Sequence, residues 1–372
     1  MKIVHLSDTH LGWRELHHTD AEGHNLREQD VYEALATAID RVLELEPALV
    51  VHSGDLFHGY HPFSAALGVA LDQIERLRTA GIEFVVIAGN HETPRVRAIA
   101  HPFSLLERFG VNAVHGEPRR LRFGDLGVTA VPHSNDPEAM AGWIAAAEPD
   151  PDARFNVLVA HAGLEGLARV GAGEPGAVEL PGELLEQVAS FDYIALGHLH
   201  QLERPRVNAV YPGSLERLSW ADQARRKGIV GIDLAAEPLD DAFLELHEIE
   251  GRPRKRLPAL DAGKVDDLTK AISRLAKGKG LEGAIVKVPI ANVSFEKYGA
   301  IDRRKIAEAF GHCLHLELEP EFTEARTGLP QPAAPAELRE FLSRRVPPGV
   351  EAEVFVTRGE NYMTRAAEDI GA

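Results

Sequence analysis

The sequence predicts an α/β protein. Five runs rich in aliphatic and β-branched residues are typical of buried strands, at residues 3–6, 49–52, 84–88, 157–159 and 193–196. Segments with a helical spacing of apolar residues separate the first three runs. A short polar motif directly follows each run. Because open α/β sheets bind ligands just beyond the carboxyl ends of their strands, we expect the five motifs to meet at one edge of the sheet.

The helices are predicted from apolar stripes that a proline or a glycine ends. Three such stripes lie in the first third of the chain, at residues 26–46, 64–79 and 99–109. Two further strands, near residues 228–233 and 243–249, complete a first domain of residues 1–250. Residues 171–182, rich in glycine and proline, are expected to form a loop that either borders a substrate groove or is a plain surface connection.

The motifs after the strands carry the donor atoms of a metal site. They are Asp8-Thr9-His10, Gly54-Asp55, Gly89-Asn90-His91, Ala160-His161 and Gly197-His198-Leu199-His200. Carboxylate, amide and imidazole donors without a thiolate favour Mn, Fe, Zn or Co. Together they can hold two ions if one carboxylate is shared, and Asp55 is the best candidate for that position. Two such ions can clamp a phosphate ester and lower the pKa of a bridging water.

His91 stands apart from the expected ligands. It follows the amide of Asn90, so we expect it near the metals but free to donate a proton or to stabilise charge on a phosphoryl group. Any one of these motifs occurs by chance in many chains, whereas five in order, each after a strand, predict a site. Of the other histidines, we expect sheet packing for His5 and His52 and a solvated loop for His17, His18 and His24, and we assign no role to His101, His115 and His133.

The order of the motifs resembles that of the calcineurin-like metallophosphoesterases, whose fold is a sandwich of two mixed sheets flanked by helices. The surrounding residues resemble one branch of that family, the nuclease subunit of the double-strand-break processing complex, of the SbcD and MRE-eleven type. The strings that carry this resemblance are His5-Leu6-Ser7-Asp8-Thr9-His10-Leu11-Gly12, Gly54-Asp55-Leu56-Phe57-His58 and Tyr211-Pro212-Gly213-Ser214-Leu215-Glu216-Arg217. It is clear from residue 1 to about 233 and looser beyond.

The resemblance implies two divalent metal ions, with Mn²⁺ as the usual metal of the family. The implied ligands are Asp8, His10, Asp55 and His200 for one ion, and Asp55, Asn90, His161 and His198 for the other. The resemblance also implies that His91 is the transition-state histidine and His58 a second active-site histidine. Glu92 departs from the aspartate that is more frequent in the family after the Gly-Asn-His motif. Because that residue is not a ligand, the assignment is unchanged.

The function implied is that of a metal-dependent DNA nuclease, with 3′-to-5′ exonuclease and single-strand endonuclease activity in double-strand-break or hairpin processing. A hydroxide activated by both metals would attack the phosphodiester. The implied partners are DNA, an SMC-like ABC ATPase of the SbcC type and a second copy of the chain. Two alternatives stay open: a phosphodiesterase for small molecules or cyclic nucleotides, which the motifs alone permit, and a non-catalytic DNA-tethering scaffold.

Residues 251–325 are predicted to form a second, small α/β domain. Helices are expected at residues 266–275 and 303–310, and strands at 283–290 and 314–318. In position and alternation this domain resembles the DNA-capping domain of the family. Residues 326–372 are expected to form a linker rich in proline and alanine and a helical tail, a candidate for binding the ATPase partner.

Composition sets further expectations. The formal net charge is −17, and basic residues cluster at residues 119–122, 225–227 and 252–256, where solvated surface is a more frequent role than a nucleic-acid patch. We therefore expect weak DNA binding by this chain alone. No apolar run is long enough to span a membrane, and no signal peptide could be removed without losing Asp8. A single cysteine, Cys313, excludes an intrachain disulfide and suits a reducing cytosol, so we expect a cytoplasmic, nucleoid-associated protein.

Overall fold

The computed structural model describes residues 1–96, 99–167, 176–222 and 226–323, together with residues 339, 342, 343, 345, 346 and 351–359. Two compact units make up the chain. The first comprises Met1–Lys255, Gly278–Val286 and Gly311–Leu316, and the second Arg256–Lys277, Lys287–Phe310 and Glu317–Ala372. Most of the expected linker and tail at 326–372 and part of the expected loop at 171–182 lie outside the described residues.

The first unit contains two six-stranded sheets. In spatial order the first sheet consists of β14 (Leu244–Glu248), β13 (Gly228–Asp233), β1 (Lys2–Leu6), β2 (Leu49–His52), β3 (Glu83–Ile87) and β4 (Asn112–Val114). Strands β1 to β4 run parallel, whereas β13 is antiparallel to β1 and β14 antiparallel to β13. The carboxyl ends of β1, β2 and β3 therefore lie at the same edge.

The second sheet is also mixed. Its order is β11 (Glu203–Arg206), β12 (Ala209–Tyr211), β10 (Tyr193–Gly197), β7 (Phe155–His161), β6 (Leu126–Val131) and β5 (Arg119–Phe123). β7 runs parallel to both β10 and β6. A separate parallel pair, β8 (Gly163–Leu164) and β9 (Glu179–Leu180), follows β7. The five predicted motif strands are thus β1, β2 and β3 in one sheet and β7 and β10 in the other.

The main core lies between the two sheets. Alternate residues of β1 and β2, such as Ile3 and Val51, pack in one buried cluster with Val157, Tyr193 and Val210 of the second sheet. The opposite faces of both sheets are buried as well. Because both faces of β1, β2, β3, β7 and β10 are covered, these strands are almost continuously apolar, which is why the sequence shows them as runs without alternation.

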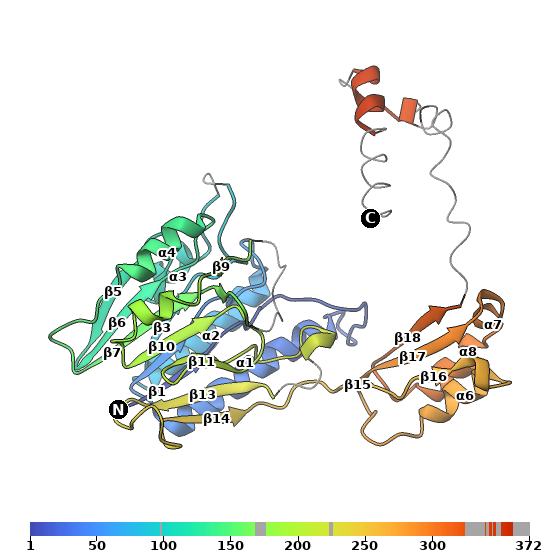
Figure 1. Ribbon diagram of the computed structural model, residues 1–372, viewed down its shortest axis with the longest axis horizontal. Coiled ribbons are helices and arrows are strands. Elements are labelled where there is room, and N and C mark those ends of the chain that lie inside the picture. Colours follow the sequence, from blue (N-terminus) through green and yellow to red (C-terminus); the bar gives the residue numbers. More distant parts are fainter. Residues whose placement is uncertain are drawn as a thin grey trace. The chain divides into compact units, whose positions relative to one another are not determined.

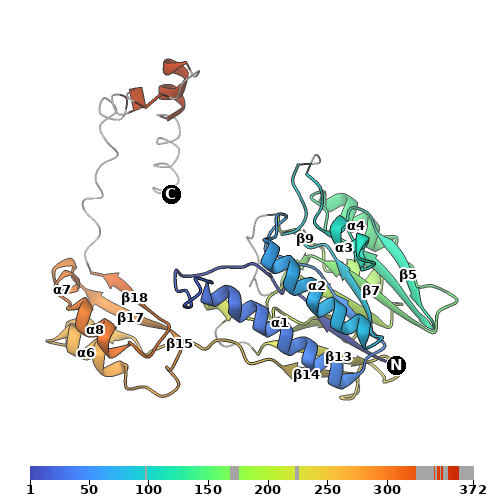
Figure 2. The same ribbon diagram turned by 180° about the vertical axis from the view of Figure 1, so that it is seen from behind.

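Helices cover the outer face of each sheet (Figure 1; Figure 2). α1 (Leu26–Leu45), α2 (Ser64–Thr79) and α3 (Phe103–Arg108) contribute to the cluster that buries the first sheet. α4 (Pro137–Ala145) and α5 (Leu184–Gln187) contribute to the cluster on the second. The predicted fold class, two mixed sheets flanked by helices, is confirmed. No described helix combines the length and the apolar character that a membrane crossing requires.

One predicted helix is shorter than expected. Residues 99–109 were expected to be helical, but α3 begins only at Phe103, with Pro102 as its N-cap. A residue before proline is disfavoured in the helical region, so His101 is excluded from the helix. The His101 ring instead accepts a hydrogen bond from the backbone N–H of Phe103 at 3.1 Å. The prediction was therefore wrong for its first four residues.

The C-terminal part of the described chain holds a four-stranded sheet. β17 (Ile285–Val293) pairs with β15 (Arg254–Arg256), β16 (Leu260–Asp261) and β18 (His315–Phe322). The remaining helices are α6 (Leu268–Leu275), α7 (Phe295–Gly299) and α8 (Arg303–Ala309), with short 3-10 turns at Trp220–Asp222 and Ala262–Lys264. The predicted alternation of helix and strand is confirmed here, whereas the domain limits at residues 250 and 325 and the capping role stay predictions.

Candidate metal centre

All seven expected metal ligands lie where strands of the two sheets end. Asp8 and His10 follow β1, Asp55 follows β2, and Asn90 follows β3. His161 is the last residue of β7, while His198 and His200 follow β10. Each of these side chains is at most 5% exposed. Since buried polar groups without partners are costly, such a set requires either hydrogen bonds or a bound cation.

The ligand atoms gather in two groups. The first consists of Asp8, His10 and His200, and the second of Asp55, His161 and His198, with the ligand atoms of each group within 4.8 Å of one another. Asn90 joins the second group, because its Oδ1 lies 3.0 Å from His161 Nε2 and 3.1 Å from His198 Nδ1. The structure thus brings together every residue that the sequence analysis named as a ligand.

Asp55 lies between the two groups. Its Oδ2 is 3.3 Å from His161 Nε2 and 3.7 Å from His10 Nε2, one ring from each group. Its Oδ1 accepts the backbone N–H of His91 at 3.0 Å. Oδ2 is buried and accepts no hydrogen bond from any described residue. A carboxylate oxygen in this position can face two cations at once.

The hydrogen bonds of His161 show why a cation fits. Its Nδ1 lies 2.8 Å from the carbonyl oxygen of Ser53, which can only accept, so Nδ1 carries a proton. A neutral His161 ring then presents a bare lone pair at Nε2 to two further acceptors, Asn90 Oδ1 and Asp55 Oδ2. Three acceptors facing one another in a buried site repel unless a cation or a proton lies among them. The residues present therefore fit a metal ion.

The pKa values follow the same electrostatics. Burial lowers the pKa of His10 well below its usual value, so this ring is neutral and has a lone pair for a metal. Burial also opposes protonation of His161, but the carboxylates of Asp55 and Asp8 outweigh it and raise the pKa of His161 to about 9. Burial disfavours ionisation of Asp55 as well, yet the positive charge of His161 holds the pKa of that carboxyl well below its usual range.

Backbone geometry points the ligands inward. Asp8, His10, Asp55 and His198 have positive φ angles of 51°, 52°, 55° and 106°. Residues other than glycine rarely adopt positive φ angles, and those that do cluster at functional sites. The loops are held by backbone hydrogen bonds that continue past the strand ends, from Asp8 N to Gly54 O at 3.0 Å and from His10 N to Asp55 O at 2.9 Å. The N–H of His198 donates to Asp8 Oδ1 at 3.1 Å.

Glycines in the motifs leave room for the ligands. A Cβ atom on Gly89 would lie 2.1 Å from Asp55 Oδ1, and one on Gly54 would lie 2.3 Å from His161 Nδ1. At Gly197 it would lie 2.0 Å from the Ser53 carbonyl oxygen, the acceptor of His161. Any side chain at these three positions would displace a ligand or the group that orients it. The glycine before the polar residue is therefore part of the site.

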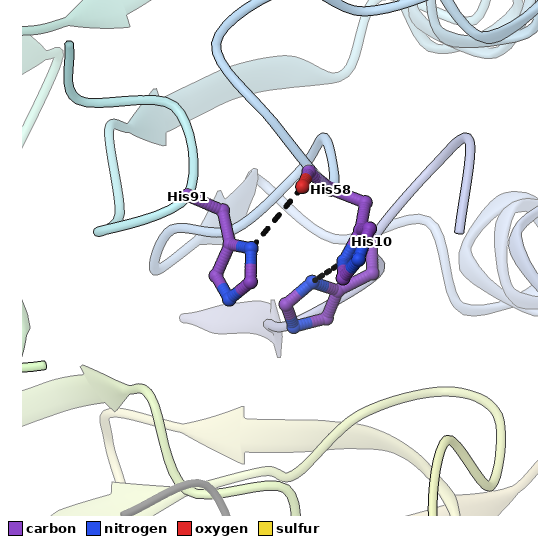
Figure 3. Close-up of side chains that lie close together, drawn as sticks. All are labelled: His10, His58 and His91. Atoms are coloured by element: carbon purple, nitrogen blue, oxygen red, sulfur yellow. Dashed lines mark hydrogen bonds between the residues drawn. The ribbon is translucent and has the colours of Figure 1, made fainter. Parts of the chain in front are cut away.

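The two expected catalytic histidines lie beside the first group (Figure 3). The His91 ring stacks on that of His58 with centroids 4.9 Å apart, and its Nδ1 donates to the His58 carbonyl oxygen at 3.1 Å. The Nδ1–H of His91 is thus bound to a backbone acceptor. His58 Nδ1 lies 3.2 Å from His10 Nδ1, and the three rings His10, His58 and His91 converge.

Glu92 has a role that the sequence analysis missed. It is fully buried, and its Oε1 accepts the N–H of Phe57 at 2.7 Å while Oε2 accepts that of Gly89 at 2.9 Å. It therefore joins the loops that carry Asp55 and Asn90. Burial, reinforced by the charge of Asp55, raises the pKa of Glu92 to about 8. The only sequence signal was its place directly after the Gly-Asn-His motif.

The other histidines mostly lie as expected. His5 is buried and bonds Tyr193 Oη and Ser53 Oγ, both at 2.8 Å, and His52 Nε2 lies 2.7 Å from Thr9 Oγ1. Their predicted packing role is confirmed, and both support motif loops. His17, His18 and His24 are exposed, as predicted. Of the unassigned residues, His101 stacks on His115 and His133 Nε2 donates to the Gly176 carbonyl oxygen at 2.9 Å.

Two basic clusters are only partly the solvated surface that their sequence favoured: Arg226, Lys255 and Arg256 are exposed, whereas other members are buried or paired. Arg254 and Lys227 are 3% and 2% exposed. Arg252 makes a bidentate ion pair with Asp30 at 2.5 and 2.6 Å, and Arg254 pairs with Glu15. Lys227 pairs with Asp222 at 2.9 Å. The expectation was wrong for Arg252 and Arg254 because their carboxylate partners are distant in the sequence, and for Lys227 because its side chain is buried against Asp222.

The comparison with known proteins agrees with this site. Residues 1–202 match the family model for calcineurin-like phosphoesterases. The chain belongs to the calcineurin-like phosphoesterase family. This match confirms the prediction of a metal-dependent phosphoesterase, a class whose centre binds divalent metal ions.

Similar proteins include archaeal DNA double-strand break repair proteins named Mre11. The one from Methanocaldococcus jannaschii is 29% identical over 264 residues, which cover 68% of this chain and 68% of that protein. The one from Sulfurisphaera tokodaii is 32% identical over 203 residues, covering 54% of this chain and 49% of that protein. These matches confirm the resemblance to the SbcD and MRE-eleven branch. They span between about half and two thirds of the length of these relatives.

Among solved structures, a dimetal phosphatase from Danio rerio aligns with 62% of this chain and 91% of its own, at 12% identity and a TM-score of 0.38.

Proposed function

We propose that this chain is a DNA nuclease that uses two divalent ions, with Mn²⁺ as the metal, to cleave phosphodiesters in double-strand-break or hairpin processing. The observation that carries the proposal is the shared position of Asp55 between two buried ligand groups. The choice of DNA is supported by the Mre11 relatives, whose names state a role in DNA double-strand break repair. We propose 3′-to-5′ exonuclease and single-strand endonuclease activities.

The ligand atoms divide between the ions as follows. Asp8, His10, Asp55 and His200 would hold one ion, and Asp55, Asn90, His161 and His198 the other. Bound there, the metals would supply charge that holds the phosphate and lowers the pKa of an attacking water. His161 is oriented by the Ser53 carbonyl, as is usual for ligands whose second nitrogen bonds a backbone acceptor.

His91 would act on the phosphate itself. Its Nδ1–H donates to the His58 carbonyl oxygen, so a proton for a phosphoryl oxygen or for the leaving group would come from Nε2–H of the doubly protonated ring. Stacking on His58 fixes the plane of the ring. We therefore propose His91 as a catalytic residue and His58 as the residue that positions it.

Four further points belong to the proposal. The chain forms a homodimer, and it works with an SMC-like ABC ATPase of the SbcC type. We propose that residues 326–372, most of which lie outside the described residues, bind that ATPase. Because its substrate is DNA, the protein acts in the cytoplasm, in association with the nucleoid.

Replacement of His91 tests the proposal. We expect His91→Leu to lower cleavage of end-labelled duplex and hairpin DNA with Mn²⁺ by about 100-fold or more, since general acid catalysis contributes at least that much. Calorimetry should still show two bound Mn²⁺ ions. His17→Leu, which removes an exposed histidine, is the matched control and should leave cleavage unchanged. Full activity of His91→Leu would refute the assignment.

A second comparison separates DNA from small substrates. The same enzyme is assayed on duplex DNA and on an aryl phosphodiester, with Mn²⁺ and with Mg²⁺. A DNA nuclease should strongly prefer DNA. A strong preference for the aryl ester would instead favour the small-molecule phosphodiesterase, and a chain that binds no metal would favour the tethering scaffold.

A further inference from the structure

The Tyr211–Arg217 string supplies no residue of the proposed ligand sets, yet it lies against one of them. Gly213 has a φ angle of 83°, and a Cβ atom there would lie 3.0 Å from the His200 carbonyl oxygen and 2.9 Å from the Gln201 carbonyl carbon. Only glycine permits so close an approach. The Pro-Gly-Ser turn is therefore packed directly on the backbone that carries His200.

Lys227 binds the same backbone. Its side chain is fully buried, and its ammonium group donates to the His200 carbonyl oxygen, to Ser214 Oγ at 2.8 Å and to Asp222 Oδ1 at 2.9 Å. An ammonium group has three N–H donors, so all of them are used. The N–H of Ser214 also donates to the His200 carbonyl oxygen, at 3.3 Å.

The partners of Lys227 are themselves fixed. Ser214 Oγ donates its proton to the Glu216 carbonyl oxygen at 2.8 Å, which leaves it free to accept from Lys227. Asp222 Oδ2 accepts the backbone N–H and the hydroxyl of Ser219, both at 3.0 Å. The charges of Lys227 and Asp222 neutralise each other. The hydrogen bonds of Lys227 and Ser214 converge on the His200 carbonyl oxygen.

Stability alone is a weak reason for such a pair. Taking two charges out of water costs about as much free energy as their attraction returns, so apolar residues of similar size would often serve the fold as well. What apolar residues would not supply is a fixed direction for the His200 carbonyl. The ring of that residue has its Nε2 only 3.2 Å from His10 Nε2, in the first ligand group.

We propose that Lys227, together with Ser214 and Asp222, is a positioning group for His200, and that it sets the affinity of the ion bound by Asp8, His10, Asp55 and His200. This inference rests on the proposed metal centre. It gives the Tyr211–Arg217 string a role, since Gly213 and Ser214 supply the close approach and one of the hydrogen bonds.

The test measures Mn²⁺ binding by calorimetry on the full chain. The main variant is Lys227→Met with Asp222→Asn, which removes both charges so that neither is left buried alone. Ser214→Ala is the second variant, because it deletes only one hydroxyl. Arg226→Met is the matched control: it removes the same charge one residue earlier, from an exposed side chain paired with Glu248.

We expect the double variant to fold and to bind one of two Mn²⁺ ions about 10- to 100-fold more weakly, the usual effect of losing a group that orients a ligand. The affinity of the double variant for the other ion should stay within about threefold of that of the wild type. The same holds for both affinities of the Arg226→Met control. Ser214→Ala should weaken the same ion by a smaller factor. If the double variant does not fold, the inference is tested by whether Ser214→Ala weakens the binding of that one ion.

Two results would overturn the inference. Unchanged binding of both ions in a folded variant would show that the carbonyl needs no anchor, and equal weakening of both ions would indicate a general structural role. In either case a wild-type chain that binds two ions leaves the proposed function standing. If the wild type binds no Mn²⁺, both the proposed function and this inference fail.

Discussion

At the scale of single residues, the site combines strained backbone angles with hydrogen bonds that hold them. Asp8, His10 and Asp55 are held at positive φ, which costs about 1–3 kcal/mol for each residue. Backbone hydrogen bonds between the loops after β1 and β2 offset this cost and fix the direction of each side chain. A site of this kind is pre-formed, so little reorganisation is needed when cations bind.

The shared position of Asp55 leads to a prediction about stoichiometry. Asp55→Asn places an amide N–H₂ or a neutral oxygen between His161 and His10, where a carboxylate oxygen now lies 3.3 and 3.7 Å from their Nε2 atoms. We expect both Mn²⁺ ions to be lost, whereas Asp8→Asn should weaken only one. Metal content after dialysis measures the difference. An Asp55→Asn protein that keeps one tightly bound ion would contradict a bridging role.

Glu92 is predicted to matter for stability. Glu92→Ala leaves the buried N–H groups of Phe57 and Gly89 without their acceptors, so we expect unfolding free energy to fall by about 2–5 kcal/mol. Urea unfolding of the metal-free protein measures it. Glu83→Ala, at an exposed position of β3, is the control and should change stability by about 0.5 kcal/mol or less. A loss below about 1 kcal/mol for Glu92→Ala would show that the two loops hold each other without it.

At the scale of elements, the helices over the first sheet leave apolar side chains in solvent. Tyr60 and Leu105, 38% and 39% exposed, line one depression with Pro62 and Leu67. Phe63, the N-cap of α2, and Phe109, the C-cap of α3, are 54% and 61% exposed. Exposed apolar groups of this size gathered on one region are typical of protein interfaces. They support the proposed homodimer, and we propose this surface, beside α2 and α3, as its contact.

This surface gives a prediction about assembly. Tyr60→Glu combined with Leu105→Glu introduces two charges where a partner would bury apolar surface, so a dimer should become a monomer in sedimentation experiments. The fold should persist because both side chains are already exposed. Val207→Glu, at an apolar position that is 45% exposed in the second sheet's β11–β12 connection, serves as the control. A wild-type chain that is already monomeric would rule out this interface.

At the scale of the whole molecule, charge opposes DNA binding. The net charge is −17, and Lys227, Arg252 and Arg254 are engaged with carboxylates. Affinity for DNA comes mostly from cations that replace counterions along the phosphate backbone. These three side chains are buried or paired, so they contribute little to such binding. A partner that supplies basic surface would then provide most of the affinity.

We expect the isolated chain to bind duplex DNA weakly, with a dissociation constant above about 1 μM at physiological salt, in the range of non-specific binding. The slope of log affinity against log salt should be shallower than about −4, since each neutralised phosphate contributes close to −1. Fluorescence anisotropy with Ca²⁺ in place of Mn²⁺ measures both quantities. Tight binding with a steep slope, in the absence of any partner, would be the contrary result.

The sequence by itself determined the architecture and the donor atoms of the site. Strand ends are set by local apolar runs, and the ligands lie at or shortly after the ends of β1, β2, β3, β7 and β10, so their meeting could be predicted. That the strands belong to two sheets, and not to the one sheet edge expected from the motifs, appears only in the structure. The helix expected at 99–109 was placed too early because the effect of Pro102 on its preceding residue outweighed the apolar stripe.

Only the tertiary structure decided how those atoms divide and what supports them. His198 donates to Asp8 across 190 positions of sequence, and Arg252 pairs with Asp30 across 222. The links from Glu92 to Phe57 and from Lys227 to the His200 carbonyl have no local pattern that marks them, because folding brings these distant partners near. Local apolar runs predict where a strand ends. Contacts between distant segments depend on how the two sheets pack.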